Sequence, residues 1–557
     1  MHVWFCVPAM GERLGRADGK HHGNAMGSRR PHRRLAAASS GTDQPHPCGA
    51  KRPPADLWPL SCVQARNAVR LPLVRSAVRF ILDGQIRELS GLDPTTTVLQ
   101  WLRTAERRCG TKEGCAEGDC GACTVVLGEL VGDDIRLRAV DACLLFVPVL
   151  DGKALFTVES LRAAGGALHP VQQAMVDCHG SQCGFCTPGF VMSMFALFES
   201  ERELPTRQRI DEVLAGNLCR CTGYRPIVES VGRAYALGTE AGRAHRTELL
   251  EQLRAISSPE GLDLEHVGKR FLAPRSLPEL ARFLETHPDA RLVAGATDLA
   301  LLVTKEHRDL PLLVSVNHVP ELRSIKDTST HLEIGAAVTY TEVLGPLTAR
   351  HPALGGLLRR LGSTQIRNVG TLGGNVANAS PIGDTPPALL ALDASVVLRR
   401  GELSRELPLS EFFLGYRKTV LRPGEFLEGI RVPHGPPKRL FRVYKVAKRF
   451  DQDISAVCGA FAVELEGDRV RTARIAFGGM AAVPIRVPGA EGALAGKIWG
   501  EPSVEAAARI LATELTPISD MRASAAYRRL VAGNLLRRFL LEVGPHPIRP
   551  RSTEVWS

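Results

Sequence analysis

Gly114-Cys115-Ala-Glu-Gly-Asp-Cys120-Gly-Ala-Cys123 gathers three cysteines in one short glycine-rich stretch, and a fourth follows at Cys143. Four residues and then two separate the first three cysteines, which is the plant-type spacing for a [2Fe–2S] cluster. A two-iron cluster needs four thiolates, and glycines let a tight loop bring three of them to one point. Backbone N–H groups in such a loop can also point at the sulfur atoms. The stretch therefore predicts an iron–sulfur site with these four cysteines as ligands.

Two other interpretations of these cysteines are buried structural thiols and a zinc site. The alternation of glycines with cysteines disfavours structural thiols. Zinc knuckles usually pair one C-x2–4-C motif with a second such motif, whereas this pattern is three cysteines plus one, so it favours the cluster. Cys109 lies outside the ligand spacing, and we interpret it as a structural residue.

The residues around the cysteine loop predict a ferredoxin-like β-grasp domain over residues 75–158. Asp83-Gly84 is a type I′ turn signal between two apolar runs, so it predicts a β-hairpin. Asp93-Pro94-Thr95 is expected to open a helix with one apolar face. Two further strands are expected at 124–127 and 136–140.

A second set of cysteines lies downstream, as Cys183-Gly-Phe-Cys186 and Cys219-Arg-Cys221. A C-x2-C pair alone is compatible with a redox disulfide or with half of a zinc site. Its combination with C-x-C is far more restrictive. Pro188 suits the first turn of a helix after Cys186, and helix dipoles beside the cysteines would favour anionic sulfur.

Two glycine turns occur in the C-terminal part of the chain. Gly295-Ala-Thr-Asp298 ends a predicted strand at 290–294, and Thr371-Leu-Gly-Gly-Asn375 follows later. Neither fits G-x-G-x-x-G, so a Rossmann dinucleotide-binding fold is excluded. Each turn alone is ordinary, but glycine also lets backbone N–H groups approach phosphate oxygens closely. A helix at 280–284, strands at 457–465 and 475–477, and an amphipathic helix at 504–515 are expected as well.

Three motifs together resemble the two iron–sulfur domains of the xanthine dehydrogenase and molybdenum hydroxylase family: Gly114–Thr124, His179–Gly189 and Gly216–Pro226. All of that family's ligand positions are filled, by Cys115, Cys120, Cys123, Cys143, Cys183, Cys186, Cys219 and Cys221. The resemblance implies an all-α [2Fe–2S]-binding domain over residues 159–240, with its cluster nearer a molybdenum cofactor. The ferredoxin-like cluster would lie nearer a flavin. It also implies that Gln182 hydrogen-bonds the pterin, or else caps its own loop, while Cys178 has no place in the family pattern.

The two glycine turns, at this separation, resemble the pyrophosphate-binding loops of the same family's flavin domain. The resemblance implies a PCMH-type α+β FAD-binding domain over residues 265–436 and a C-terminal α/β flavoprotein domain over residues 437–545. The residues at FAD-contact positions are Leu292, Val293, Ala294, Gly295, Ala296, Thr297, Asp298, Leu299, Leu361, Thr371, Leu372, Gly373, Gly374, Asn375, Asp384, Leu427 and Lys445. Leu361 stands where the family often has an aromatic residue. Arg449 and Asp451 match a segment near the flavin and nicotinamide entry, although a solvated charged turn is an equal alternative.

The resemblance implies the electron-transfer subunit of a split xanthine dehydrogenase, because the residues left over are too few for the family's long molybdopterin domains. Two [2Fe–2S] clusters and FAD would carry electrons to NAD, from xanthine or hypoxanthine oxidised at a molybdenum cofactor in a large partner subunit. Substrate hydroxylation should need no catalytic residue in this chain, and two small and two large subunits would form a heterotetramer. A subunit of an aldehyde or other heterocycle hydroxylase and a stand-alone iron–sulfur flavoprotein are the alternatives.

Composition adds limits to these expectations. The chain has 557 residues and a formal charge of +11, and residues 1–74 hold eleven Lys/Arg and four Asp/Glu, which is +7 of that total. We expect this stretch to be a disordered extension, residues 241–264 to be a linker and residues 546–557 to be a tail. No apolar run reaches the roughly 18 residues of a membrane helix; the best candidate, residues 142–150, contains Pro148 and is expected to be a buried strand at most. Nucleic-acid binding is not expected. Fourteen cysteines, clustered in short motifs, indicate metal ligation in a reducing, cytoplasmic compartment.

Overall fold

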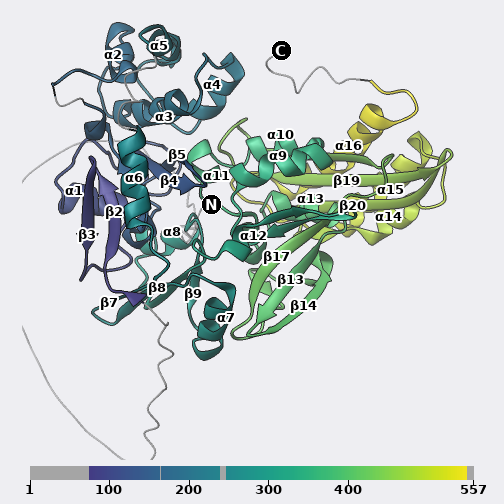
Figure 1. Ribbon diagram of the computed structural model, residues 1–557. Coiled ribbons are helices and arrows are strands. Elements are labelled where there is room, and N and C mark those ends of the chain that lie inside the picture. Colours follow the sequence, from purple (N-terminus) through teal and green to yellow (C-terminus); the bar gives the residue numbers. More distant parts are fainter. Residues whose placement is uncertain (1–73, 163–164, 239–245, 549–557) are drawn as a thin grey trace, which may run out of the picture. The chain divides into compact units, whose positions relative to one another are not determined.

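The computed structural model describes residues 74–162, 165–238 and 246–548 (Figure 1). The predicted extension falls outside them except for Val74, as does the predicted tail from residue 549 onward. The described chain has the predicted α+β class, with a β-grasp sheet, a group of helices and two further regions that contain both helices and sheets. No helix in these described ranges is long and apolar enough to cross a bilayer.

A five-stranded mixed sheet forms the first domain and contains the predicted hairpin. Its strands pair in the order β3-β2-β6-β4-β5, with β2 and β6 parallel. Asp83 and Gly84 have φ angles of 53° and 68°, as the predicted type I′ turn requires. The elements are β2 (Val78–Leu82), β3 (Gln85–Leu89), α1 (Val98–Thr104), β4 (Thr124–Val131), β5 (Asp134–Asp141) and β6 (Ala154–Phe156).

The first helix begins later than predicted. Asp93 accepts hydrogen bonds from the N–H and the hydroxyl of Thr95, at 2.8 and 2.6 Å, and therefore closes a turn. Thr97 is the N-cap of α1 and forms a capping box with Gln100. The capping box satisfies backbone N–H groups that Asp93 cannot reach, so it sets the helix start.

The apolar stretch 142–150, expected to be at most a buried strand, is buried but is not a strand. A turn at its start is followed by a 3₁₀ helix over Val147–Leu150. Pro148 has no N–H to give to a sheet, which accounts for the difference.

Four helices form the described part of the second domain: α2 (Pro170–Asp177), α3 (Thr187–Ser200), α4 (Arg207–Leu214) and α5 (Arg225–Ala236). α3 follows Cys186 directly and has Pro188 in its first turn, as predicted. Its apolar residues Phe190 and Met194 are buried and pack against α2 and α5. The Met and aromatic stripe of this helix is therefore core.

The interval 241–264, expected to be a polar linker, contains a packed helix. α6 (Arg246–Ile256) directs Leu253 and Ile256 onto Ile81 of the β-grasp sheet. These apolar residues recur at helical spacing among charged residues. The high charge of the segment concealed its one apolar face.

Two five-stranded sheets build the region predicted to bind FAD. The first has the order β1-β7-β8-β10-β9, so β1 (Val74–Arg75) pairs with β7 in parallel although the β-grasp domain lies between them in sequence. The second has the antiparallel order β11-β12-β17-β13-β14.

The elements of the first sheet and its helices are β7 (Gly261–His266), β8 (Lys269–Ala273), α7 (Leu277–Thr286), β9 (Arg291–Val293), α8 (Leu299–Thr304) and β10 (Leu312–Ser315). Those around the second are β11 (Ile325–Asp327), β12 (His331–Gly335), α9 (Tyr340–Arg350), α10 (Ala353–Arg359), α11 (Thr364–Arg367), α12 (Leu372–Ala377), α13 (Thr385–Ala391), β13 (Ser395–Arg400), β14 (Leu403–Pro408), β15 (Phe413–Gly415), β16 (Lys418–Thr419) and β17 (Phe426–Pro433). α7 and β9 confirm the helix and strand predicted there.

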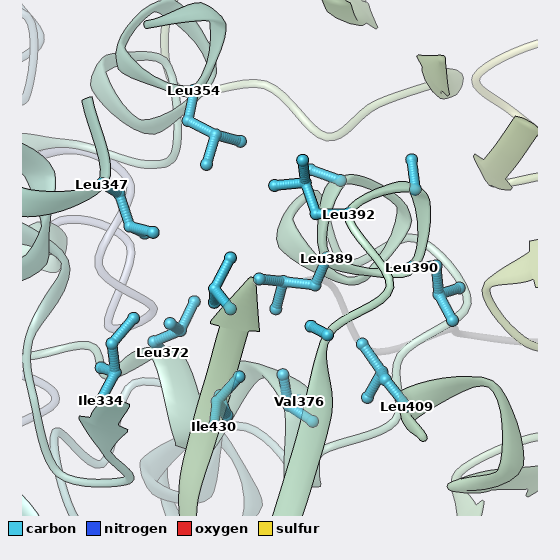
Figure 2. Close-up of a cluster of buried hydrophobic side chains, with 14 of the residues drawn as sticks. Ile334, Leu347, Leu354, Leu372, Val376, Leu389, Leu390, Leu392, Leu409 and Ile430 are labelled. Atoms are coloured by element: carbon cyan, nitrogen blue, oxygen red, sulfur yellow. The ribbon is translucent and has the colours of Figure 1, made fainter. Parts of the chain in front are cut away.

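Buried aliphatic side chains hold the second sheet to its helices (Figure 2). Leu372 and Val376 of α12 point into this cluster, beside Ile334 of β12 and Ile430 of β17. None of these four side chains is more than 1% exposed. The second glycine turn, which lies at the start of α12, is therefore anchored to a close-packed core.

The last region has a four-stranded antiparallel sheet, β18-β19-β20-β21, and three helices. Their bounds are β18 (Leu440–Val446), β19 (Val457–Glu466), β20 (Arg469–Gly478), β21 (Ile485–Arg486), α14 (Pro488–Leu494), α15 (Glu501–Glu514) and α16 (Ala525–Val543). β19, β20 and α15 confirm the predictions. The long helix α16 was not predicted, and it carries a buried Arg528 paired with Asp520 at 2.7 Å.

Replacing Leu253 with alanine should destabilise the β-grasp domain. This side chain is fully buried against the sheet. A buried Leu→Ala change lowers the free energy of unfolding by about 2–5 kcal/mol. We expect the melting temperature, followed by the visible absorbance of the first cluster, to fall. Glu251→Ala, on the exposed face of the same helix, is the control, and equal melting temperatures for both variants would contradict the packing of α6.

Candidate cofactor-binding sites

Backbone N–H groups of the first cysteine loop point at the predicted sulfur ligands. The Cys115 N–H donates to Cys120 Sγ at 3.3 Å, and the N–H groups of Glu117 and Asp119 donate to Cys115 Sγ at 3.4 and 3.3 Å. Gly118 takes a φ angle of 81°, which the turn between these donors requires. Such bonds stabilise sulfur as an anion and tune a cluster's potential.

The other predicted ligands close a set of four thiols. Cys123 and Cys143 are buried and hydrogen-bonded to one another, and the Gly118 N–H donates to Cys143. Cys123 lies close enough to Cys120, and Cys115 close enough to Cys143, for its negative charge to oppose ionisation of the neighbouring thiol and so to act to raise that thiol's pKa. The hydrogen bond with Cys115 lowers the pKa of Cys120 to about 7.

The second set of cysteines is also brought together. The sulfur atoms of Cys183 and Cys221 lie 3.5 Å apart, and Cys186 interacts with Cys219. The Thr222 N–H and hydroxyl contact Cys219 Sγ at 3.5 and 3.2 Å. Cys186 is the N-cap of α3, as expected from Pro188, while Cys183 and Cys221 are exposed.

The donor sets fit binuclear clusters. A [2Fe–2S] cluster spreads four thiolates over two irons. Each set supplies four thiols, and backbone N–H groups are directed at the sulfur atoms of Cys115, Cys120 and Cys219. Each set of four cysteines can therefore hold one cluster, with backbone N–H groups of the same loops directed at the sulfur atoms.

The two cysteine loops touch one another. The Leu218 N–H donates to the carbonyl of Cys120 at 3.0 Å. Leu218 precedes Cys219 in the chain. This hydrogen bond therefore links Cys120, a ligand of the first set, to the residue next to Cys219, a ligand of the second set.

The two glycine turns also lie together, as the resemblance implied. A Cβ atom at Gly295 would collide with the carbonyl of Val369, two residues before the second turn. Thr371 caps α12 by accepting from the Gly374 N–H at 3.0 Å, and Asp298 is the N-cap of α8. Backbone N–H groups in the first turns of two helices suit the pyrophosphate of FAD. The residues of both turns fit that group.

Tyr340 lies close to both turns, and sequence reasoning missed it. Its N–H donates to the Gly370 carbonyl at 3.0 Å. Burial raises the pKa of its hydroxyl, and the carboxylates of Asp298 and Asp384 raise it further. No sequence pattern identifies a single tyrosine at a helix start, since its position becomes evident only when both turns are placed in space.

Asp384 and Lys445, both predicted FAD contacts, form a buried ion pair. Lys445 Nζ donates to Asp384 Oδ2 at 2.5 Å, and the Ser455 hydroxyl donates to the other carboxylate oxygen. The two charged side chains are 3% and 8% exposed. Ser455 was missed because no motif surrounds it in the sequence. With Lys445, it gives each oxygen of the Asp384 carboxylate a hydrogen-bond donor.

Leu361 and Leu427, the predicted isoalloxazine contacts, are both buried members of the aliphatic cluster that packs against the second sheet. Next to Leu361, the Arg360 guanidinium donates to the carbonyls of Lys445 and Phe450 at 3.1 Å and lies 4.6 Å from the Phe450 ring. These contacts place Leu361 close to β18, the strand that carries Lys445.

Asp451 and Arg449, predicted near the flavin edge, have different environments. Asp451 is half-buried; burial raises the pKa of its carboxyl, and the guanidinium groups of Arg367 and Arg360 oppose that rise. Arg449 is exposed and pairs with Asp453 at 3.5 Å. The description of a solvated charged turn therefore fits Arg449 and not Asp451.

Three other residues singled out in the sequence lie at or near the surface. Cys109, interpreted as structural, is exposed, so it has no packing role. Gln182 is exposed beside Cys183, and Cys178 is half-buried at the end of α2.

Four family models match successive parts of the chain. A 2Fe-2S iron–sulfur cluster binding domain matches residues 80–147, and a [2Fe-2S] binding domain matches residues 157–232. The FAD binding domain in molybdopterin dehydrogenase matches residues 266–435, and the CO dehydrogenase flavoprotein C-terminal domain matches residues 442–543.

Xanthine dehydrogenase from Drosophila pseudoobscura pseudoobscura is 34% identical over 531 residues, covering 84% of this chain and 39% of that protein. Aldehyde oxidase 2 from Cavia porcellus is 33% identical over 527 residues, covering 83% of this chain and 39% of that protein. A solved structure of carbon monoxide dehydrogenase from Hydrogenophaga pseudoflava is 30% identical, covers 48% of this chain and 94% of that one, and gives a TM-score of 0.46. The chain spans about two fifths of the length of the curated relatives it matches.

Two [2Fe–2S]-binding domains and an FAD-binding domain make this chain an iron–sulfur flavoprotein. It belongs to the molybdenum hydroxylase family of oxidoreductases. The predicted fold class is confirmed, while the individual FAD contacts stay predictions.

Iron content tests the two ligand sets separately. The wild-type chain should bind about four irons, because each [2Fe–2S] cluster holds two. Cys143→Ala and Cys186→Ala should each reduce this to about two, measured by iron and acid-labile sulfide analysis. Cys109→Ala, which removes an exposed cysteine outside both sets, should leave the iron content unchanged; loss of iron in this control would refute the ligand assignment.

Replacing Lys445 with methionine should weaken flavin retention. The change leaves the buried Asp384 carboxylate without its cation, and breaking a buried pair costs about 3–5 kcal/mol. We expect a lower melting temperature and less bound FAD by absorbance. Lys448→Met, at an exposed lysine three residues on, is the control. The double variant Asp384→Asn/Lys445→Met should recover part of the loss, and no recovery would show that the lysine acts through another contact.

Proposed function

We propose that the chain is the electron-transfer subunit of a xanthine dehydrogenase, with its molybdenum cofactor in a partner large subunit. Electrons from xanthine or hypoxanthine would enter at the cluster of the second cysteine set, which we call the Cys183 site (Cys183, Cys186, Cys219 and Cys221). They would then pass to the cluster of the first set, the Cys115 site (Cys115, Cys120, Cys123 and Cys143), and leave from FAD to NAD. When bound, the [2Fe–2S] clusters supply one-electron steps and FAD supplies the change to two-electron hydride transfer. The residues of this chain hold, orient and electrostatically tune these groups.

The contact between the two cysteine loops is the observation that carries the proposal. The Leu218 N–H and Cys120 carbonyl join the two ligand sets at 3.0 Å. Cys183 and Cys221 are exposed whereas Cys123 and Cys143 are buried. An exposed set suits electron entry from a partner, and a buried set suits an internal relay.

The first cysteine loop also reaches the flavin-binding region. Lys305 Nζ, at the end of α8, donates to the Cys115 carbonyl. The N-cap of α8 is Asp298 of the first glycine turn. One short helix therefore connects the Cys115 site with a predicted pyrophosphate loop, which supports the order of the relay.

NAD as the acceptor rests on Asp451. Its half-buried carboxyl lies near Arg360 and Arg367, in the segment that the family resemblance assigns to the nicotinamide entry. A carboxylate in the electrostatic field of two guanidinium groups is suited to adjust the charge beside the flavin. A cytoplasmic location and an assembly of two small and two large subunits are parts of the same proposal.

An aldehyde hydroxylase subunit is the second candidate, because aldehyde oxidase 2 is as similar to this chain as the xanthine dehydrogenase is. The donor discriminates between the two. Xanthine should reduce the purified holoenzyme if the first candidate is correct, and an aldehyde should do so if the second is.

The relay is tested with Cys219→Ser in the holoenzyme isolated together with its partner chain. Xanthine-dependent NAD reduction should fall to background, because the change removes a ligand of the entry site. NADH should still reduce the flavin, since the FAD region is untouched. Wild-type turnover in this variant would refute the relay order, and a holoenzyme without a molybdopterin-binding partner would refute the subunit assignment.

A further inference from the structure

The segment that leads into Cys219 is held by contacts from distant parts of the chain. Gln452, from the loop between β18 and β19, donates to the Ala215 carbonyl. Asn217 Nδ2 donates to the Gly121 carbonyl at 2.9 Å, inside the first cysteine loop. Gln365 of α11 contacts Asn217 from the flavin-binding side, at 3.1 Å.

Gln365 is at the centre of a buried polar junction made by three domains. Its Nε2 atom donates to Ser193 Oγ at 3.0 Å, to Asn217 Oδ1 at 3.1 Å and to Thr124 Oγ1 at 3.3 Å. Thr124 belongs to the β-grasp domain, Ser193 and Asn217 to the helical domain, and Gln365 to the flavin-binding region. None of the four residues is more than 2% exposed.

The hydroxyl groups of the junction set the orientation of the Gln365 amide, whose Oε1 atom is buried without a hydrogen-bond partner among the described residues. The Ser193 hydroxyl donates to Asn217 Oδ1 at 2.6 Å, and the Thr124 hydroxyl donates to the Gly121 carbonyl at 2.6 Å. Both hydroxyl oxygens are then left to accept from Gln365, so the amide nitrogen, not the oxygen, must face them. A buried network with these partners is rigid, because breaking any of its hydrogen bonds leaves a polar group buried without a partner and out of reach of water.

Close backbone contacts reinforce the junction. A Cβ atom at Gly121 would collide with the Gly216 carbonyl, and one at Gly189 would collide with the Gly121 carbonyl. The loops therefore meet at backbone distance, and small shifts of Asn217 would be transmitted to Cys120 and Cys219.

We propose that Gln365 is a positioning residue for electron transfer between the two clusters. It does not touch a ligand sulfur; it fixes Asn217, and through it the separation of the loops that carry Cys120 and Cys219. In this way the flavin-binding region sets the geometry of a step that takes place between the other two domains. The inference rests on the proposed transfer between two [2Fe–2S] sites.

The test uses Gln365→Met, which keeps the length of the side chain and removes its hydrogen bonds, and Gln365→Glu, which keeps the shape and replaces the donor nitrogen with an acceptor. The readout is the electron paramagnetic resonance of the reduced holoprotein, because magnetic coupling between two clusters depends steeply on their separation. Redox titration of each cluster is the second readout. Gln252→Met, which removes a hydrogen bond to Gly84 from α6, is the matched control.

We expect full iron content in both Gln365 variants, with a loss of the wild-type coupling and a shifted potential for the Cys115 site. The control should match the wild type. Unchanged coupling and potentials would overturn the proposal, and so would loss of iron in both variants, since Gln365 would then serve folding alone. Failure of the two-cluster relay itself would be seen separately, as an absence of paired cluster signals in the wild type.

Discussion

A backbone hydrogen bond between two cysteine loops constrains the whole arrangement of this chain. Leu218 can reach the Cys120 carbonyl at 3.0 Å only if the β-grasp and helical domains meet at backbone distance. That contact demands glycine at Gly121, because any side chain there would collide with the Gly216 carbonyl. Folding and electron flow therefore depend on the same few atoms.

Buried charges hold the β-grasp domain to the flavin-binding region. Arg138 donates to Glu342 at 2.6 Å, and while burial raises the pKa of Glu342, this guanidinium and the Thr339 N–H lower it to about 2. Asp151, which is fully buried, accepts from Arg75 and Arg275 at 2.6 and 3.0 Å. Charges buried in pairs tolerate little displacement, so they keep domain orientation fixed while the apolar clusters supply most of the stability.

Local chemistry made much of the fold and site predictable. The cysteine spacing, the Asp83-Gly84 turn and the start of α3, with Pro188 in its first turn, follow from rules that act over a few residues. The start of α1 and the helix α6 were misjudged because a better cap at Thr97 and a narrow apolar face were hidden among polar residues.

The parts of the site that were missed are those made by distant segments. Tyr340 and Ser455 gain their positions from turns far away in sequence. Gln365 has no motif around it and becomes noticeable only when Thr124, Ser193 and Asn217 surround it. Spacing identifies ligands along one loop, but it carries no information on what several folded segments place beside that loop.

The pairing of β1 with β7 affects how such a chain can be recombined. Val74 lies opposite Gly261 in a parallel register, and the entire β-grasp and helical portions lie between them in sequence. In sequence, therefore, the iron–sulfur portion is inserted between two adjacent strands of the flavin-binding sheet. An exchange of modules at the sequence boundary near residue 75 would divide one sheet between two parents, so this boundary does not separate the two portions structurally.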